Sequence, residues 1–104
     1  MESFSKYPSE SFTIDTDFSD VLGTGETILS GTSTVKVYQD NSAETEVTSS
    51  MIEGSVSVSG TKLRARIKAG SEDTNYFVKW TALTSANNTF ENIVRLRVLR
   101  QIGT

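Results

Sequence analysis

The residues of this chain that come nearest to a chemical site are three aspartates in an acidic stretch. Asp15, Asp17 and Asp20 are spaced as in the first half of a calcium-binding loop. The stretch lacks the downstream glutamate that serves such a loop as a bidentate ligand, and it lacks the glycine at its fixed position. We therefore expect a solvated loop that turns through Gly23 and Gly25, with no metal ligands.

The side chains on which most catalytic sites depend are absent. The sequence contains no histidine and no cysteine, so it offers no imidazole base, no thiolate nucleophile and no usual zinc ligand. The remaining acid/base candidates are surface carboxylates in a loop, without a neighbour that would tune them. We predict that the protein is not an enzyme, has no catalytic residues and binds no cofactor.

Basic residues gather in two alternating runs in the second half of the chain. Seven of the ten basic residues belong to these runs: Lys62, Arg64, Arg66 and Lys68 in the first, and Arg95, Arg97 and Arg100 in the second. If both runs faced the same way, they would form a positive stripe suited to nucleic acid or to an acidic protein surface. The pI of about 4.9 and the lack of exposed aromatic platforms argue against nucleic acid, which leaves either a solvated, partly ion-paired sheet face or a contact with an acidic protein.

The charge of the chain is divided unevenly. Residues 1–53 carry ten acids and two bases, whereas residues 54–104 carry three acids and eight bases, within a net charge of −3. In a sandwich the two halves interleave, so these charges would partly neutralise one another. Alternatively, an acidic side and a basic side would suit joining copies head to tail.

The basic runs need strands to hold them, and the sequence predicts such strands. In residues 62–68 Leu63, Ala65 and Ile67 alternate with the basic residues, a period of two that puts the apolar and basic side chains on opposite faces of a strand. Residues 76–83 are rich in aromatic and β-branched side chains, typical of a largely buried strand. Five polar residues separate the two runs, so we expect them to pair as a central hairpin with Trp80 buried.

Shorter strand-like runs cover much of the remaining chain. We expect strands near residues 12–15, 27–29, 35–38, 51–58 and 91–100, with a loop or weak edge strand around Val47. Together these runs predict an all-β protein, an immunoglobulin-like β-sandwich of about seven short antiparallel strands.

Two further predictions concern the N-terminus and the membrane. Residues 1–11 are expected to be an arm with little order, ahead of a sandwich domain at residues 12–104. Phe4 and Tyr7 on this arm would anchor a neighbouring protein or fold back onto their own domain. The apolar runs are far shorter than the roughly 20 residues that cross a bilayer, and no secretory signal is apparent, so we expect neither a membrane partner nor export by that route.

The order of several short motifs resembles the fibre–tail adaptor family of tailed bacteriophages. The matching pieces are residues 17–22 (DFSDVL), 26–28 (ETI), 69–70 (AG), 74–78 (TNYFV) and 96–98 (LRV), spread over roughly residues 12–101. Ala69 stands where a second glycine is usual, and residues 85–88 stand where a Gly-Arg turn is usual. These departures affect the loops more than the strands.

The resemblance implies a virion structural protein, assembled in the host bacterial cytoplasm, that joins the tail or connector to fibres. Its partners would be tail, connector or fibre subunits and further copies of itself, contacted through Phe4, Tyr7 and the basic residues Lys62, Arg64, Arg66, Lys68, Arg95 and Arg97. The alternatives are another immunoglobulin-like virion part, such as a capsid decoration or tail ornament, and a carbohydrate-binding or adhesin module.

Overall fold

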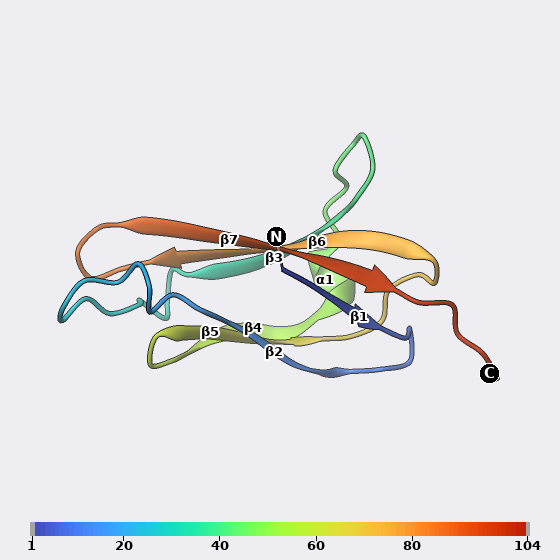
Figure 1. The fold of residues 1–104 in the computed structure, drawn as a ribbon, viewed down its shortest axis with the longest axis horizontal. Coiled ribbons are helices and arrows are strands. Elements are labelled where there is room, and N and C mark those ends of the chain that lie inside the picture. The colour runs from blue at the N-terminus through green and yellow to red at the C-terminus, as the bar shows by residue number, and fades with distance from the viewer. Residues whose placement is uncertain (1, 104) are drawn as a thin grey trace.

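Two β-sheets packed face to face make up the protein, as a computed structural model that describes residues 2–103 shows (Figure 1). The four-stranded sheet has the order β1-β7-β6-β3, and the three-stranded sheet has the order β2-β5-β4. The strands are β1 (Ser3–Lys6), β2 (Phe12–Asp17), β3 (Thr34–Gln39), β4 (Ile52–Ser59), β5 (Lys62–Ile67), β6 (Thr74–Leu83) and β7 (Thr89–Val98). A single helical turn, α1 (Thr48–Met51), precedes β4.

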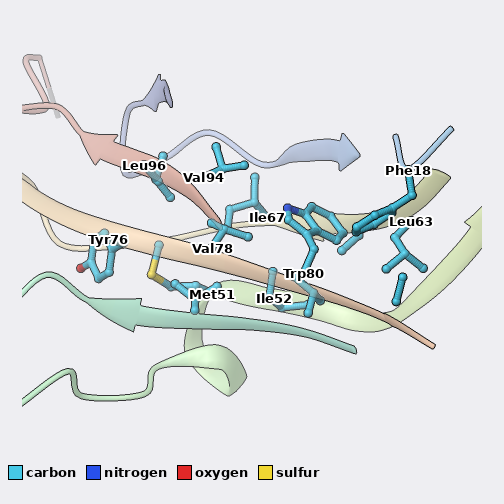
Figure 2. Close-up of a cluster of buried hydrophobic side chains, with 14 of the residues drawn as sticks. Phe18, Met51, Ile52, Leu63, Ile67, Tyr76, Val78, Trp80, Val94 and Leu96 are labelled. Carbon is cyan, nitrogen blue, oxygen red and sulfur yellow. The ribbon is translucent and has the colours of Figure 1, made fainter. Parts of the chain in front are cut away.

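The alternation predicted from the sequence decides which side chains enter the space between the sheets. On β6 every second residue is buried, namely Tyr76, Val78, Trp80 and Ala82. Figure 2 shows Val78 and Trp80 close to Ile67 of the opposite sheet, within one cluster of buried apolar side chains. Trp80 is 1% exposed, which confirms the prediction that it is buried. The all-β sandwich of seven strands is also confirmed.

The predicted central hairpin is wrong, because β5 and β6 lie in different sheets. The chain leaves the three-stranded sheet after β5 through Ala69 and Gly70, whose φ angles of 55° and 96° are both left-handed. A Cβ atom on Gly70 would stand 2.8 Å from a methyl group of Val98, so this crossing requires glycine both for its φ and for its space. Alternation reported correctly which face of each strand is buried, but it carries no information about which strand is the neighbour.

The residues expected to form an arm with little order instead begin the sandwich. β1 pairs with β7 in parallel, from Ser3 opposite Arg95 to Lys6 opposite Val98, so the strands are not all antiparallel. The Phe4 ring packs edge to face on Phe12, with the ring centroids 6.4 Å apart. These residues therefore fold back onto their own chain.

One smaller expectation also differs from the structure. Residues 27–29 form no strand, and an isolated bridge between Ile28 and Thr84 ties them to the four-stranded sheet. The loop or weak edge strand expected around Val47 is a loop with an isolated bridge from Glu46 to Tyr38, and the turn α1 begins at the residue after Val47. β4 pairs with β5, from Ser59 opposite Lys62 back to Ile52 opposite Ile67.

A buried lysine fixes β1 to the crossing between the sheets. Lys6 is 1% exposed, and its Nζ donates hydrogen bonds to the carbonyl oxygens of Tyr7 at 2.8 Å, Pro8 at 3.4 Å and Ala69. Burial lowers the pKa of Lys6, and the nearby Glu10 carboxylate opposes that shift. Because an ammonium group has three donors and no acceptor, three carbonyls satisfy it in full.

Replacing Trp80 with alanine is expected to destabilise the protein by about 3–5 kcal/mol, since it removes the largest buried side chain from the central strand. Chemical denaturation followed by circular dichroism measures this change. Thr81→Ala, one residue along β6 on the outer face, is the matched control and is expected to cost less than about 1 kcal/mol. Equal effects of the two substitutions would contradict the packing described here.

Lys6→Met is expected to destabilise the protein by about 1–3 kcal/mol, because it keeps the length of the side chain but leaves three carbonyl oxygens without their donor. The free energy of unfolding in urea tests this, with Lys36→Met at an exposed position of β3 as the control. A Lys6→Met protein as stable as the wild type would show that the ammonium group does not hold β1 in place.

Candidate partner-binding surface

The aspartate stretch forms a hydrogen-bonded turn. Asp17 Oδ1 accepts hydrogen bonds from the Thr61 hydroxyl at 2.7 Å and from the Ser19 amide at 2.9 Å. These bonds, that of Thr61 above all, lower the pKa of the Asp17 carboxyl. Within residues 2–103, no three acidic side chains are grouped as a metal ion would require. The same residues include no helix long and apolar enough to cross a membrane.

A second carboxylate ties two loops together at this end of the sandwich. Glu26 accepts hydrogen bonds from the Gly23 amide at 2.8 Å, from the Asn88 side-chain amide at 2.9 Å and from the hydroxyl of the buried Thr84. The same bonds lower the pKa of Glu26, with that of the Gly23 amide as the largest cause. The loop after β2 is thereby fastened to the loop between β6 and β7.

The two basic runs lie on opposite faces of the molecule. Arg64 and Arg66 project from the outer face of the three-stranded sheet, whereas Arg95 and Arg97 project from the outer face of the four-stranded sheet. The single positive stripe therefore does not form. Lys68 follows β5 and is half-buried, and Tyr7 follows β1 and is 43% exposed.

Carboxylates pair with most of these basic side chains. The ion pairs are Arg64 with Asp15 at 3.8 Å, Arg66 with Glu53 at 3.3 Å, Arg95 with Asp40 at 3.7 Å and Arg97 with Asp73 at 3.5 Å. Three of the four carboxylates come from the acidic first half of the sequence, so much of the predicted asymmetry neutralises within one molecule. Each exposed pair contributes little to stability, about 0–1 kcal/mol. Partner binding by these residues stays a prediction.

A hollow of about 430 Å³ on the outer face of the four-stranded sheet is the main exposed apolar site. Its lining consists of Tyr38 on β3, Phe77 and Lys79 on β6, Ile93 on β7, and Glu44 from the loop after β3. We call this site the outer hollow. In Figure 1 the loop after β3 projects beyond the sheet, and Glu44 of this loop belongs to the lining of the hollow. The Arg95 guanidinium lies over the Phe77 ring, 5.4 Å from its centroid, in a cation–π contact.

This site was not predicted from the sequence, although the sequence contains a signal for it. On β3 and β6 the alternation places Val35, Val37 and Val78 inside, and it therefore places Tyr38 and Phe77 on the outer face. An aromatic residue on the face that should be polar is unusual, and two on adjacent strands mark an apolar patch.

The outer face of the three-stranded sheet has a different character. Along β4 the exposed positions are Glu53, Gly54, Ser55, Ser57 and Ser59, and along β5 they are arginines paired with carboxylates. The molecule thus has one face with an apolar centre and one that is polar throughout the described strands.

Seven strands in two sheets, with these inward faces, define an immunoglobulin-like β-sandwich. The structure of murine CRIg matches with a TM-score of 0.54, 16% sequence identity and coverage of 96% of this chain and 94% of that one. At that identity the likeness shows the fold alone.

The family is shown by a separate comparison of sequences. The chain belongs to the family described as "Podophage GP4 fiber-tail adaptor protein gp77", whose model matches residues 6–97. No curated protein matches the chain. The resemblance to phage fibre–tail adaptors is therefore confirmed. As the adaptor between fibre and tail that the family description names, the protein is a virion component in contact with tail and fibre proteins.

Glu26→Gln is expected to lower the melting temperature at pH 7, because an amide cannot accept all the bonds that the carboxylate accepts. Since the folded pKa of Glu26 lies below the ordinary value of about 4.3, ionised Glu26 stabilises the fold above about pH 4.3. That contribution is lost as the pH falls through the folded pKa. The difference in melting temperature between wild type and variant should therefore shrink in acid, and the exposed Glu2→Gln serves as the control. A difference that is constant with pH would argue against the role of the ionised carboxylate.

Proposed function

We propose that this protein is a non-enzymatic adaptor in the neck or tail of the phage particle, assembled in the host bacterial cytoplasm. It joins the tail or the connector to fibres through protein–protein contacts. The family match over residues 6–97 is the observation that carries the proposal. The protein would perform this role through its shape and its surface contacts, without a chemical step.

The outer hollow supports the proposal, because it has the composition of a protein interface. Tyr38, Phe77 and Ile93 give it an apolar centre, and Ile93 is 39% exposed. Around it lie ion-paired residues such as Arg95 and Lys79. Aromatic and arginine side chains at the centre, inside a polar rim, are typical of the parts of an interface that contribute most of the binding energy.

The other predicted contact residues keep their place in the proposal. Arg95 and Arg97 lie beside the outer hollow, where an acidic partner surface could exchange its own carboxylates for the present ion pairs. Lys62, Arg64 and Arg66 lie on the outer face of the three-stranded sheet, on the opposite side of the sandwich, and Lys68 directly follows β5. An adaptor has to hold two proteins at once, and opposite faces allow this without overlap.

We further propose that the protein acts in several copies. A particle that carries fibres around a tail axis requires one adaptor contact for each fibre, and assemblies of this kind are symmetric. The N-terminal arm expected from the sequence does not support an assembly of several copies, because β1 pairs within its own chain. Phe4 is engaged with Phe12, so Tyr7 is the exposed aromatic residue of this region that remains for a neighbouring copy.

The alternative of a carbohydrate-binding module is weakened, because its main candidate for a sugar-binding residue is buried. Trp80 is the only tryptophan of the chain, and it lies in the core rather than on a surface platform. No observation favours a capsid decoration over an adaptor.

Ile93→Asp is expected to reduce the number of copies in purified particles at least tenfold, because it places a charge in the apolar centre of the outer hollow. Quantitative mass spectrometry of particles assembled with the variant measures this number. Ser57→Asp, an equally exposed change on the other face, is the matched control and should be incorporated normally. Melting temperatures of both purified variants establish that they fold.

Normal incorporation of a folded Ile93→Asp protein would reject the outer hollow as the docking site. Failure of the wild-type protein to associate with tail or fibre proteins would reject the adaptor role itself. The mass of the wild-type oligomer on the particle gives the copy number.

A further inference from the structure

The edge of the four-stranded sheet is incomplete beside the first half of β7. β7 pairs with β6 along all of Thr89–Val98, but β1 covers only the part from Arg95 to Val98. Among residues 2–103, no strand lies beside the stretch from Thr89 to Val94 on that side. The residues that the structure describes therefore leave a notch one strand wide beside β7, ahead of the point where β1 begins.

Backbone groups of β7 face this notch. The Arg95 amide donates to the Glu2 carbonyl at 2.9 Å, so the backbone of Arg95 faces the β1 side. In a strand every second residue directs its N–H and C=O to the same side. The groups of Glu91 and Ile93 therefore point into the open position, where an added strand would bond with them.

An apolar crevice lies beneath the notch, between the edges of the two sheets. It has a volume of about 270 Å³, and its lining includes Trp80, Val94, Phe12 and Ile14. We call it the edge crevice. The Phe4–Phe12 pair closes one end, and a 2.7 Å hydrogen bond from the Asn92 side chain to the Thr16 hydroxyl joins the two edges further along. This space is large enough for an apolar side chain carried by an added strand.

The charge around the edge crevice is negative. Glu2 and Asp15 line it, and they also line an adjoining hollow together with Asp17 and Asp20. Among residues 2–103, two basic side chains face these four carboxylates. Lys62 lines the same hollow, and the exposed Arg64 lies 3.8 Å from the exposed Asp15. A bound segment in which basic side chains alternate with apolar ones would match both the apolar lining of the edge crevice and the carboxylates around it.

Two other sheet edges, those of β4 and β3, are less suited to an added strand. β4 has an irregular register between Glu53 and Ser57, with Gly54 at a φ of 77°, and such bulges obstruct pairing. The edge of β3 is already occupied in part, since Val37 bonds to Val47 and Thr48. The notch beside β7 is thus better suited to an added strand than either of these two edges.

We propose that the notch beside β7 binds an extended segment of a partner protein in which apolar and basic residues alternate. The segment adds as a strand next to Glu91–Val94, directs one apolar side chain over Trp80 into the edge crevice and brings its basic side chains near Glu2 and Asp15. Strand addition of this kind draws affinity from main-chain hydrogen bonds and specificity from pockets for alternate side chains. The proposal rests on the adaptor function and specifies the kind of segment that a tail or fibre protein would contribute.

The test uses the full chain and a blocked nine-residue peptide in which lysine and valine alternate. Trp80, the only tryptophan, lies at the floor of the crevice, so its fluorescence reports occupancy directly. We expect a saturable change in Trp80 emission, together with slower hydrogen exchange at the amides of Glu91 and Ile93. The matched peptide with glutamate in place of lysine should bind at least tenfold more weakly.

Two pairs of variants locate the binding. Asp15→Lys should weaken binding of the lysine peptide at least fivefold at low salt, whereas Glu53→Lys, on the same sheet but away from the notch, should leave it within twofold. Ile14→Phe narrows the edge crevice and should also weaken binding. Its control is Val56→Phe, which lies at the opposite edge of the sandwich.

The proposal is overturned if the lysine peptide does not bind at millimolar concentration, or if it protects amides of β3 or β4 instead of β7. It is also overturned if Asp15→Lys and Glu53→Lys behave alike. These outcomes leave the adaptor function untouched, because association of the wild-type protein with tail or fibre proteins tests that function without the peptide. Circular dichroism of each variant establishes whether it is folded, so that a loss of binding is not mistaken for a loss of fold. If Ile14→Phe does not fold, the comparison of Asp15→Lys with Glu53→Lys still tests the proposal.

Discussion

The passage of the chain from one sheet to the other at Ala69 and Gly70 is the constraint on which the structure depends. β4 and β5 form one hairpin and β6 and β7 form another, and this short crossing stacks the two so that their apolar faces meet. Gly70 packs too closely on Val98 and Met51 to carry a side chain. The carbonyl of Ala69 accepts a hydrogen bond from Lys6, so the crossing also holds the first strand of the protein.

The sequence predicted the faces of the strands well and their neighbours poorly. A period of two reports which side chains are buried, and it identified Trp80 and the inward residues of β5 and β6 correctly. It does not report which strands are adjacent, since pairing depends on turn geometry, and here two successive left-handed residues redirect the chain. β1 was missed for another reason: residues 3–6 show little apolar pattern, and their lysine is inside only because three carbonyls surround it.

The same holds for the candidate surfaces: the sequence predicts which residues share a strand face, but it does not predict which strands are neighbours. The two basic runs were recognised from spacing alone, but only the sheet order shows that they face apart and that Asp15, Glu53 and Asp40 pair with them. The outer hollow was visible in principle from two aromatics on polar faces, whereas the contribution of Glu44 from the loop after β3 was not. The notch beside β7 has no sequence signal, because it arises from the difference in length between two strands that are distant in the chain.

The parallel pairing of β1 with β7 has a consequence for how the protein reaches its folded state. Among the strands of residues 2–103, the first in sequence, β1, lies at a sheet edge and pairs with the last, β7. Contacts between residues so far apart in sequence are formed slowly, because the closure of a long loop has to precede them. The hairpins of β4 with β5 and of β6 with β7 are local and do not have to wait. Although β1 precedes the other six strands in the chain, its place in the sheet therefore becomes available only once β7 has formed.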